Sequence, residues 1–331
     1  MEQNSVWNQL TRLPYLGLYT NLINSAMQLD VFSHLTAPIT AQALAQAQGW
    51  NEANTRYLLS ALVSVGFLKK EGDRYQNTPE ADRYLVRGTP EYLGGFLLFY
   101  GLSEGGVPMD VKALVTKGPQ QPEQVDQNLD FEQYGKALRE AQLGYRQEEL
   151  LRIVRALPEN KSIRKVLDMG CATGLLGLAV VNDAPERTGV LFDQLPPALI
   201  QESVDQAGMN GRIEVKKGNF LTDDLGGGYD LLLAIGVMLF AKGQMEPLLK
   251  KCYDALNPNG VLLVVGEGIE PDQTGPWDMV LGYLPYYLQG ADMGVVRSEV
   301  SDAARAAGFT RFEKHTELLC SGTQDIDVIR R

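Results

Sequence analysis

Apolar residues recur at helical spacing through the first part of the chain. Over residues 13–29 they return every three or four positions, which predicts a helix. Thr40 is a typical N-cap for a further helix over residues 41–48. Asn54 or Thr55 is expected to open the next helix, whose apolar positions hold leucine and valine.

A short β-hairpin follows these helices, with Gly72-Asp73 as its turn. Helix, turn, helix and hairpin in this order predict a winged helix, a fold that can bind DNA or act as a packing domain. The second helix carries few cations beyond Arg56 and is rich in Leu, Val and Tyr. Because contact with DNA needs cations against the phosphates, a packing surface is favoured, and a DNA-binding regulator is the less favoured alternative.

The middle of the chain has a different character. Gly, Pro and Gln are frequent over residues 90–130, which predicts a linker or covering loop in place of a packed element. Within it, residues 104–125 could close over a binding site. Over residues 131–156 an amphipathic pattern predicts one long helix that ends before Pro158.

In the second half, short β-branched and Leu-rich runs alternate with segments of helical period. Strands are expected over residues 165–169, 189–192, 212–216, 229–235 and 260–265. Helices are expected over residues 175–182, 198–207 and 245–256. This alternation predicts an α/β fold, a Rossmann-like doubly wound sheet covered on both faces. Ligands of such sheets bind at the carboxyl ends of the strands.

Cysteine and histidine are too few and too scattered for a metal site. The three cysteines, Cys171, Cys252 and Cys320, are widely spaced, and the two histidines of the sequence are His34 and His315. No disulfide framework, zinc site or His-rich metal centre is therefore expected, and the cysteine usage indicates a reducing cytoplasm.

Charge and hydropathy narrow the class of partner. A net charge of −11 disfavours nucleic acid. No run of about 18 apolar residues occurs, so no membrane span is expected, and the first residues lack the basic start and apolar stretch of a signal peptide. A small, uncharged or partly cationic ligand fits this composition better.

The first predicted strand end is rich in glycine. Residues 166–174 read Val-Leu-Asp-Met-Gly-Cys-Ala-Thr-Gly, where a strand turns into a helix. Gly170 allows a tight turn and a close approach of backbone N–H groups to a ligand. Such turns also hold NAD, FAD and nucleotides, but the spacing here matches neither G-x-G-x-x-G nor a P-loop.

Two further strand ends carry groups that suit a nucleoside. Asp193 follows the second strand and can accept hydrogen bonds from the two hydroxyls of a ribose. Asn219 and Phe220 follow the third strand, placed to meet the amino edge and the ring face of an adenine. The joint occurrence of these features favours a cofactor site over any single chance match.

Together the motifs resemble the bacterial and plant O-methyltransferases that carry an N-terminal winged-helix dimerisation domain, such as the hydroxyindole, phenazine, anthracycline and bacteriochlorophyllide methyltransferases. The glycine turn resembles the family's cofactor loop, FDQLP (192–196) its ribose-binding strand end, and GNF (218–220) its adenine step. DALNPNGVLLVVGE (254–267) resembles the hairpin-forming strand pair that closes its sheet. RSEVSDAARAAGF (297–309) resembles its late helix, and QLDVFSHL (28–35) its first-domain signature.

This resemblance implies a class I S-adenosylmethionine-dependent methyltransferase that forms a homodimer through its N-terminal helices. It implies a helical dimerisation domain over residues 1–105, a linker with pocket-covering helices over 106–160 and a catalytic domain over 161–331. By position, the residues implied in cofactor binding are Gly170, Cys171, Ala172, Asp193, Gln194, Asn219, Phe220 and Ile235.

The chain departs from the family where the general base is expected. O-methylating members carry a Lys after the adenine step and then a His-Asp pair, whose His removes the proton of the acceptor hydroxyl. Here the three positions hold Ile235, Leu239 and Phe240. Glu299 resembles the acid that partners the missing His, and without a His we expect it to cap a helix. His315 is expected to have a structural role.

Loss of this base changes which acceptors the site favours. A phenol of ordinary pKa needs a base at neutral pH, whereas an electron-rich carbon, a thiolate, an amine or an ionised enolate does not. Methyl transfer to carbon, sulfur or an ionised oxygen is therefore favoured. Otherwise another residue acts as the base, and the candidates are Glu267, Asp278, Tyr283 and Tyr287, of which the tyrosines are alternatively only pocket lining.

Apolar and aromatic residues dominate the positions that line the acceptor pocket in the family. They are Met238, Leu239, Trp277, Tyr283, Tyr286 and Tyr287. Such a lining suits a small, flat, largely apolar aromatic or conjugated acceptor. The alternative function is an enzyme of the same fold that binds S-adenosylmethionine but catalyses a non-methylating reaction, such as a rearrangement or a decarboxylation.

Overall fold

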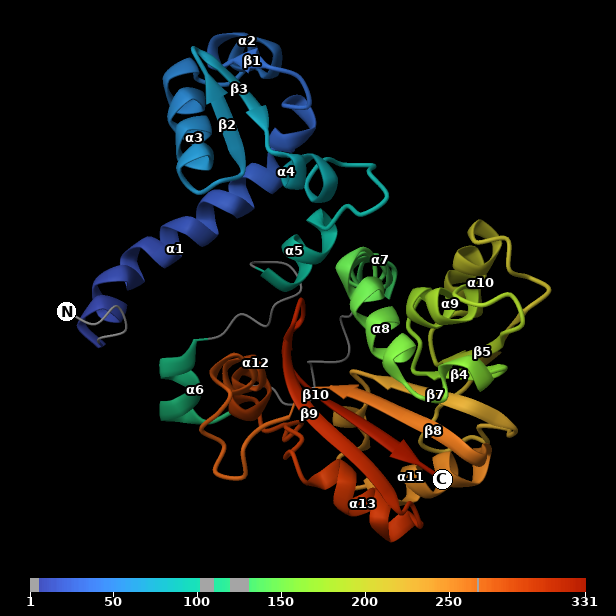
Figure 1. Cartoon of the computed structure of the whole chain (residues 1–331). Helices are drawn as coiled ribbons and strands as arrows, with labels where there is room; N and C mark the ends of the chain where they lie inside the picture. The colour runs from blue at the N-terminus through green and yellow to red at the C-terminus, as the bar shows by residue number, and fades with distance from the viewer. Residues whose placement is uncertain (1–5, 102–109, 120–130, 267) are drawn as a thin grey trace. The chain divides into compact units, whose positions relative to one another are not determined.

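The computed structural model describes residues 6–101, 110–119, 131–266 and 268–331. The chain divides into two units, one made of Met1–Pro108 with Asp130–Ala141 and the other of Met109–Leu129 with Gln142–Arg331. Figure 1 shows their helices and strands. The first unit is mainly helical, and the second is built on the large sheet.

The first unit consists of helices and a small three-stranded sheet (Figure 1). The strands, in spatial order, are β1 (Ile39–Thr40), β3 (Arg74–Asn77) and β2 (Leu68–Glu71). The helices are α1 (Val6–Gln28), η1 (Val31–His34), α2 (Ala41–Gln48), α3 (Glu52–Ser64), α4 (Pro79–Tyr84), α5 (Gly94–Gly101) and α7 (Phe131–Ala141). The succession of α2, α3 and the β2–β3 hairpin confirms the predicted winged-helix outline.

Polar side chains set the starts of α2 and α3. Thr40 caps α2 as predicted, because its Oγ1 accepts the N–H of Ala43 at 3.1 Å. The predicted start of α3 is wrong, since Asn51 Oδ1 accepts the N–H of Asn54 at 3.0 Å and the helix begins at Glu52. Either asparagine could cap a helix by its chemistry, and the earlier one does so here.

The prediction of a linker over residues 90–130 is wrong in part. Residues 94–101 form α5, and residues 111–117 form α6 (Val111–Lys117) in the second unit. The glycines of α5 belong to an apolar run in contact with α1 and α7, so burial outweighs their low helix propensity. Most of the predicted covering loop, residues 104–125, lies outside the described residues.

The single helix predicted over residues 131–156 is two helices. α7 ends at Ala141, and α8 (Tyr145–Ala156) begins after Gly144. Gly144 has a φ of +62°, a left-handed conformation that glycine adopts without steric cost and that interrupts helical hydrogen bonding. The amphipathic pattern continues across the break, which is why the pattern alone does not reveal it.

The second unit contains a seven-stranded sheet in the order β6-β5-β4-β7-β8-β10-β9. The strands are β4 (Lys165–Met169), β5 (Thr188–Asp193), β6 (Ile213–Lys217), β7 (Tyr229–Ile235), β8 (Leu256–Gly266), β9 (Arg311–Leu319) and β10 (Gly322–Arg330). The first five are parallel, and β10 is antiparallel to both of its neighbours. This confirms the doubly wound sheet. Its strand order reverses between β4 and β7, which is where ligands of such sheets bind.

The hairpin implied for residues 254–267 is wrong. Residues 256–266 form the single strand β8, and the hairpin at the sheet's end is made by β9 and β10. The polar turn signal before Gly260 produces an irregularity in the pairing of β8 with β7, and Asn259 adopts a φ of +64°. The turn residues are thus accommodated as a bulge inside one strand.

Helices cover both faces of the sheet (Figure 1). α8, α9 (Leu175–Asn182) and α10 (Pro197–Gln206) pack on one face, and α11 (Met245–Ala255) and α13 (Glu299–Ala307) pack on the other. Successive residues of β7, such as Leu232 and Leu233, belong to opposite cores because strand side chains alternate. The remaining short or peripheral helices are η2 (Asn160–Ser162), η3 (Met238–Ala241) and α12 (Trp277–Leu288). No helix of the described residues has the length and apolarity to cross a membrane.

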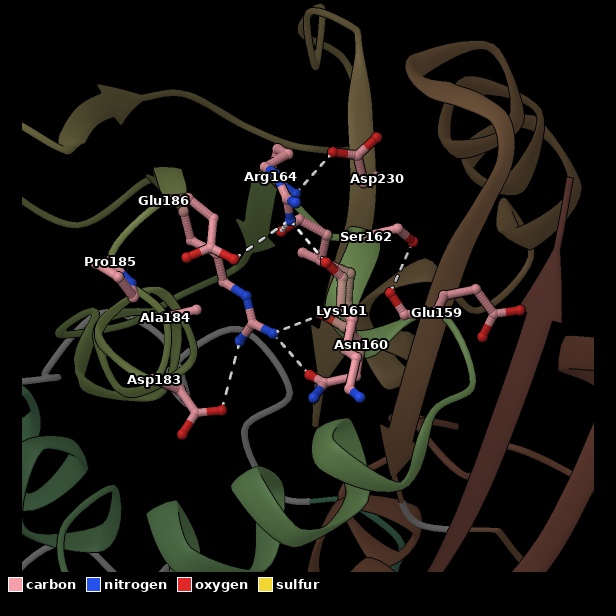
Figure 2. A network of polar contacts seen from close by, with 12 residues as sticks. Glu159, Asn160, Lys161, Ser162, Arg164, Asp183, Ala184, Pro185, Glu186 and Asp230 are labelled. Atoms are coloured by element: carbon pink, nitrogen blue, oxygen red, sulfur yellow. Dashed lines mark hydrogen bonds and ion pairs between the residues drawn. The ribbon is translucent and has the colours of Figure 1, made fainter.

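Arginine side chains fasten the amino edge of the sheet (Figure 2). The Arg187 side chain is 2% exposed and donates to Asn160 O at 2.9 Å and to Asn160 Oδ1 at 2.6 Å. The N–H of Arg164 donates to Asp230 Oδ2 at 2.9 Å, which ties η2 to the start of β7. This network holds the edge opposite the strand ends where the predicted cofactor groups lie.

Candidate active site

The glycine turn after β4 forms a tight backbone loop at the carboxyl edge of the sheet. Gly170 has a φ of +70°, and the N–H groups of Gly170 and Cys171 donate to Phe192 O at 2.8 and 3.2 Å. A Cβ at Gly170 would lie 2.5 Å from Val237 Cγ1, so a larger residue does not fit. The glycine is therefore required by packing against the loop after β7, in addition to any approach of a ligand.

Asp193, at the end of β5, is bonded to the same turn. Its Oδ2 accepts the N–H of Ala172 at 2.7 Å, and its Oδ1 accepts the N–H of Leu195 at 2.9 Å. Each oxygen keeps a lone pair for a further donor, such as the hydroxyls of a ribose. Burial raises the pKa of Asp193, although hydrogen bonds from the backbone of Leu195, Ala172 and Gln194 offset part of the shift. The Gln194 residue itself is exposed.

A second carboxyl group lies behind the glycine turn. Asp168 is 2% exposed, and its Oδ2 accepts the N–H of Gly177 in α9 at 2.9 Å. Burial raises the pKa of Asp168 to about 7, and the nearby Asp193 adds to the rise. Two acidic groups at one turn disfavour a phosphate and suit a ligand that carries positive charge.

Asn219 and Phe220 take different positions after β6. Asn219 Oδ1 accepts the N–H of Leu221 at 2.9 Å, and the pairing of β5 with β6 keeps this turn beside Asp193. Phe220 is 6% exposed and belongs to the core on the α11 face. One edge of its ring would lie 3.3 Å from a Cβ at Gly170, so Phe220 supports the glycine turn from beneath.

Two buried side chains attach the segment just before α8 to the glycine turn. Gln142 Nε2 donates to Cys171 O at 3.1 Å, and Thr173 Oγ1 donates to Gln142 Oε1 at 2.7 Å. Burial raises the pKa of the Cys171 thiol well above its usual range, so this cysteine is a small filler and not a nucleophile. These hydrogen bonds hold the residue after α7 against the glycine turn, three positions before α8 begins.

A small, partly open pocket lies between α8 and the ends of β7 and β8. Ile235, which the resemblance assigns to the cofactor site, lines it. The polar residues of the lining are Arg146, Glu149, Ser321 and Gln324. The sequence analysis missed Arg146, because one arginine on an amphipathic helix carries no signal of its own.

A second small, partly open pocket lies on the sheet face that α13 covers. Two residues predicted for the acceptor pocket, Met238 and Leu239, line it. Its charged wall comes from β9 and β10, where Lys314 Nζ lies 3.1 Å from Asp325 Oδ2 and 3.1 Å from Asp327 Oδ2. These charges compensate one another across neighbouring strands, which is a long-range pairing that the sequence analysis did not single out.

The aromatic residues predicted for the acceptor pocket do not line either of these two pockets. Tyr283 is 5% exposed, its ring centroid lies 6.0 Å from that of Tyr287, and both pack with Ile269. Trp277 and Tyr286, on the same helix, are 74% and 39% exposed. The side chains of α12 thus divide between a small separate core and solvent.

The candidate bases on α12 are weak bases in their surroundings. Burial raises the pKa of Asp278, but hydrogen bonds, chiefly the 2.8 Å bond from the N–H of Thr323, outweigh this and hold the pKa below its usual value. Burial raises the pKa of the Tyr287 hydroxyl, and nearby acidic residues add to the rise. A carboxylate of low pKa and a phenol of high pKa are both poor proton acceptors at neutral pH. Glu267, another candidate, lies outside the described residues.

Neither histidine of the sequence stands at the position of the family's base. His315 is half-exposed on the edge strand β9, where its Nε2 lies 3.1 Å from Glu317 Oε1. His34 belongs to the first unit, where its ring packs edge-on against Trp50. The position of the base is held by Leu239, in η3.

Glu299 is occupied by other partners. Its Oε2 accepts the N–H of Val296 at 2.7 Å, three residues ahead of it. The predicted cap is wrong, because Ser298 is the N-cap of α13 and Glu299, the first residue of the helix, binds the segment before it. Lys242 Nζ lies 3.6 Å from Glu299 Oε2. An ion pair with a lysine from the loop after η3 thus takes the place of a carboxylate–histidine pair.

Two family models match the chain. Residues 17–87 match the O-methyltransferase dimerisation domain. Residues 127–310 match the O-methyltransferase domain. The second match covers more than half of the sequence and includes all of the predicted cofactor residues.

Individual proteins match over nearly the whole chain. It is 28% identical over 310 residues to 3-hydroxy-5-methyl-1-naphthoate 3-O-methyltransferase of Streptomyces sahachiroi, which covers 88% of this chain and 86% of that protein. It is 27% identical over 303 residues to the N,N-dimethyltransferase OxyT of Streptomyces rimosus, covering 85% and 82%. The crystal structure of human N-acetylserotonin methyltransferase in complex with S-adenosylmethionine has the same fold, with a TM-score of 0.78, 20% identity and coverage of 99% and 98%.

Proposed function

The chain belongs to the O-methyltransferase family, and on that premise we propose that it methylates a small, largely apolar aromatic or conjugated acceptor without a histidine base. It is an S-adenosylmethionine-dependent methyltransferase. The favoured acceptor atoms are carbon, sulfur or an oxygen that is already ionised. The observation that carries this proposal is Leu239 at the position where the family's base stands.

The described residues fit S-adenosylmethionine at the carboxyl ends of β4, β5 and β6. Asp193 would accept hydrogen bonds from the ribose, and Asn219 lies on the adjoining turn. The acidic pair Asp168 and Asp193 suits a positively charged ligand better than a pyrophosphate. When bound, this cofactor supplies a methyl group on a sulfonium, which is electrophilic without further activation.

The chain's own contribution to the reaction is then mainly positioning. A nucleophile held about 3 Å from the methyl group and in line with the breaking bond can gain most of its rate from orientation alone. Met238 and Leu239 line one pocket and Ile235 lines the other, and none of these three side chains can accept a proton. This supports an acceptor that needs no deprotonation by the protein.

Nitrogen is a further acceptor atom that such a site allows. A neutral amine carries its own nucleophilic lone pair and needs no base before attack. The similarity to an N,N-dimethyltransferase supports this extension. The similarity to a naphthoate O-methyltransferase supports a flat, fused aromatic ring as the acceptor skeleton.

Methyl-labelled S-adenosylmethionine tests the proposal with one ring system and several acceptor atoms. The acceptors would be 2-naphthalenethiol, 2-naphthylamine and 2-naphthol at pH 7, with label in the product measured by mass spectrometry. We expect labelling of the thiol or the amine and little labelling of the neutral phenol. Efficient labelling of the phenol alone would contradict the proposal.

The same assay separates the alternative function, a non-methylating reaction in the same site. That alternative requires an acceptor that is consumed while no label leaves the cofactor. The absent base motivates it, since the fold could retain the cofactor as a fixed positive charge. Transfer of label to any acceptor under these conditions argues against it.

We also propose that the chain works as a homodimer through its first unit. The matched dimerisation domain supports this, as does the apolar surface of α1. Leu10, Leu13, Leu16 and Leu18 of this helix are each more than half exposed. Large apolar side chains exposed at several positions of one helix indicate a protein–protein contact.

A further inference from the structure

Arg146 is a cation without a counter-ion at the carboxyl edge of the sheet. Its side chain lines the small, partly open pocket between α8 and the ends of β7 and β8. Within the ranges that the structure describes, its guanidinium makes no hydrogen bond and no ion pair. The residue is partly buried, so this charge is incompletely hydrated and favours an anionic partner.

The guanidinium lies where a doubly wound sheet binds its ligands. Gly236 directly follows β7, and a Cβ placed on it would lie 3.8 Å from Arg146 Nη2. β7 is the neighbour of β4, and the strand order reverses between these two strands. Arg146 therefore reaches over the crevice at this reversal point, beside the strand that carries the glycine turn.

The acidic residue of the same pocket is already engaged. Both carboxylate oxygens of Glu149 accept the N–H of Cys320, at 3.0 and 3.2 Å, so Glu149 holds the β9–β10 turn. The other arginines of α8, Arg152 and Arg155, each pair with a carboxylate on the surface. Arg146 differs from both because it faces the pocket and has no partner among the described residues.

We infer that Arg146 binds the carboxylate of a ligand in the methyl-transfer site, an inference that rests on the proposed function. A planar guanidinium matches the two oxygens of a carboxylate in a bidentate geometry. Two ligands of this enzyme can carry such a group: the amino-acid end of the cofactor, and an aromatic acceptor that is itself an acid. The chemistry recognised is the same in both.

Binding measurements on Arg146→Gln separate these two sources. One arm titrates S-adenosylhomocysteine, which keeps the amino-acid carboxylate, and 5′-methylthioadenosine, which lacks it. The other arm titrates 1-naphthoate and its neutral amide, 1-naphthamide. Isothermal titration calorimetry reads binding directly, so the result does not depend on catalysis.

Loss of the guanidinium is expected to lower the affinity for the carboxylate ligand roughly tenfold to hundredfold, which is the range for a charge-assisted hydrogen bond. If the cofactor supplies the carboxylate, the variant should bind S-adenosylhomocysteine more weakly than the wild type does, while its affinity for 5′-methylthioadenosine should be unchanged. If the acceptor supplies the carboxylate, the variant should bind 1-naphthoate more weakly, while its affinity for 1-naphthamide should be unchanged. Either pattern supports the inference.

Arg152→Gln is the matched control on the same helix. It removes an exposed ion pair with Glu317 and should leave every ligand's affinity unchanged. Arg146→Lys keeps the charge without the fork and is expected to restore part of the lost affinity. Unchanged thermal midpoints for all three variants would confirm that each retains the fold.

Equal affinities of the wild type and Arg146→Gln for both carboxylate ligands would overturn the inference. An equal loss of affinity for S-adenosylhomocysteine and for 5′-methylthioadenosine would overturn the inference as well, because the effect would then not concern a carboxylate. A wild-type protein that binds no S-adenosylhomocysteine would instead contradict the proposed function, and the naphthoate arm would still decide the role of Arg146.

Discussion

Asp193 is the single residue on which the prediction of cofactor binding depends most. Its carboxylate is held by the N–H groups of Ala172 and Leu195, with room for two ribose hydroxyls. Asp193→Asn keeps the shape and removes the charge, so the affinity for S-adenosylhomocysteine should fall roughly tenfold to hundredfold. Calorimetry measures this directly. Asp205→Asn, on the surface of α10, serves as the control, and an equal loss there would refute the assignment.

The pH dependence of cofactor binding follows from the same residue. Burial raises the pKa of Asp193 above the value of about 3.9 usual for aspartate. The ribose needs the charged form, so affinity should be full above the raised pKa and decline as the pH falls through it. In Asp193→Asn this decline should be absent. An identical acid profile for both proteins would mean that another group controls binding.

Asp168 is expected to make the protein less stable as the pH rises. Its folded pKa of about 7 lies above the unfolded value of about 3.9, so the folded state holds the extra proton between these pH values. Stability from this group is present at low pH and declines by up to about 1.4 kcal/mol per pH unit across that window. Asp168→Asn should therefore gain thermal stability relative to the wild type as the pH rises from 4 to 7.

Asp230 serves as a control because its pKa is shifted in the opposite direction, below the usual value. Burial raises the pKa of Asp230, but hydrogen bonds from Asn257, Lys165 and Arg164 outweigh this and lower it overall. Its stabilisation is present above the unfolded pKa and is lost as the pH falls through the lowered one. Asp230→Asn should therefore lose stability mainly near neutral pH. Thermal midpoints that respond to pH in the same direction in both variants would contradict these assignments.

Residue identity alone predicted Asp193 but not Arg146. Asp193 follows a recognisable strand at a fixed distance from the glycine turn, so its position is readable from the sequence. Arg146 becomes notable only because α8 places it above Gly236 and leaves it without a partner among the described residues. Its surroundings come from segments about 90 and 175 residues away, which no local pattern contains.

Arg187 links elements at the amino edge of the sheet, where its side chain donates to carbonyl oxygens of α9 and η2. Its side chain is 2% exposed and lies 3.6 Å from Asp183. Arg187→Leu would leave buried carbonyl oxygens and a carboxylate without their donor, at a cost of roughly 3–5 kcal/mol. The thermal midpoint should fall by several degrees.

Arg164 belongs to the same network and is the matched control. Its guanidinium is about half exposed and lies 3.4 Å from Glu186. Arg164→Gln should cost less than about 1 kcal/mol, because exposed ion pairs are screened by water. Equal losses in the two variants would show that burial does not set the strength of this network.

The surface of α1 predicts the oligomeric state. Leu13 and Leu16 are 56% and 57% exposed on one helix. Replacing both with Glu would put two charges into an apolar contact, so the double variant should sediment as a monomer where the wild type sediments as a dimer. Leu318→Glu, at an 80% exposed position in the second unit, should leave the dimer intact. A monomeric wild type would contradict the proposal.

The periodicity of apolar residues predicted the bounds of helices and strands in the second unit better than it predicted those of α7 and α8, which join the two halves of the chain. β4, α9 and β7 have the predicted bounds, because each is a continuous apolar run between clear turn residues. The break between α7 and α8 escaped prediction because it depends on the conformation of Gly144, while the amphipathic pattern continues on both sides. In β8 the reverse occurs, and a strong turn signal is absorbed as a bulge because pairing with β7 and β10 outweighs it.

At the scale of the whole molecule, the family and the fold are established more firmly than the acceptor. The glycine turn, Asp193 and the β6 turn converge on one edge of the sheet. The position that would define an ordinary O-methyltransferase holds leucine, and the acid that would orient a histidine is paired with Lys242. We therefore propose methyl transfer in which the acceptor's own ionisation, and no side chain, sets the reactivity.

The pH dependence of kcat/KM for 2-naphthol and 2-naphthalenethiol tests this claim most directly. Without a protein base, each rate should rise tenfold per pH unit until the acceptor itself ionises, which for the aryl thiol happens at a clearly lower pH than for the naphthol. The two profiles should thus level off at different pH values. A common plateau for both acceptors near neutral pH would reveal a titrating base in the protein and contradict the account.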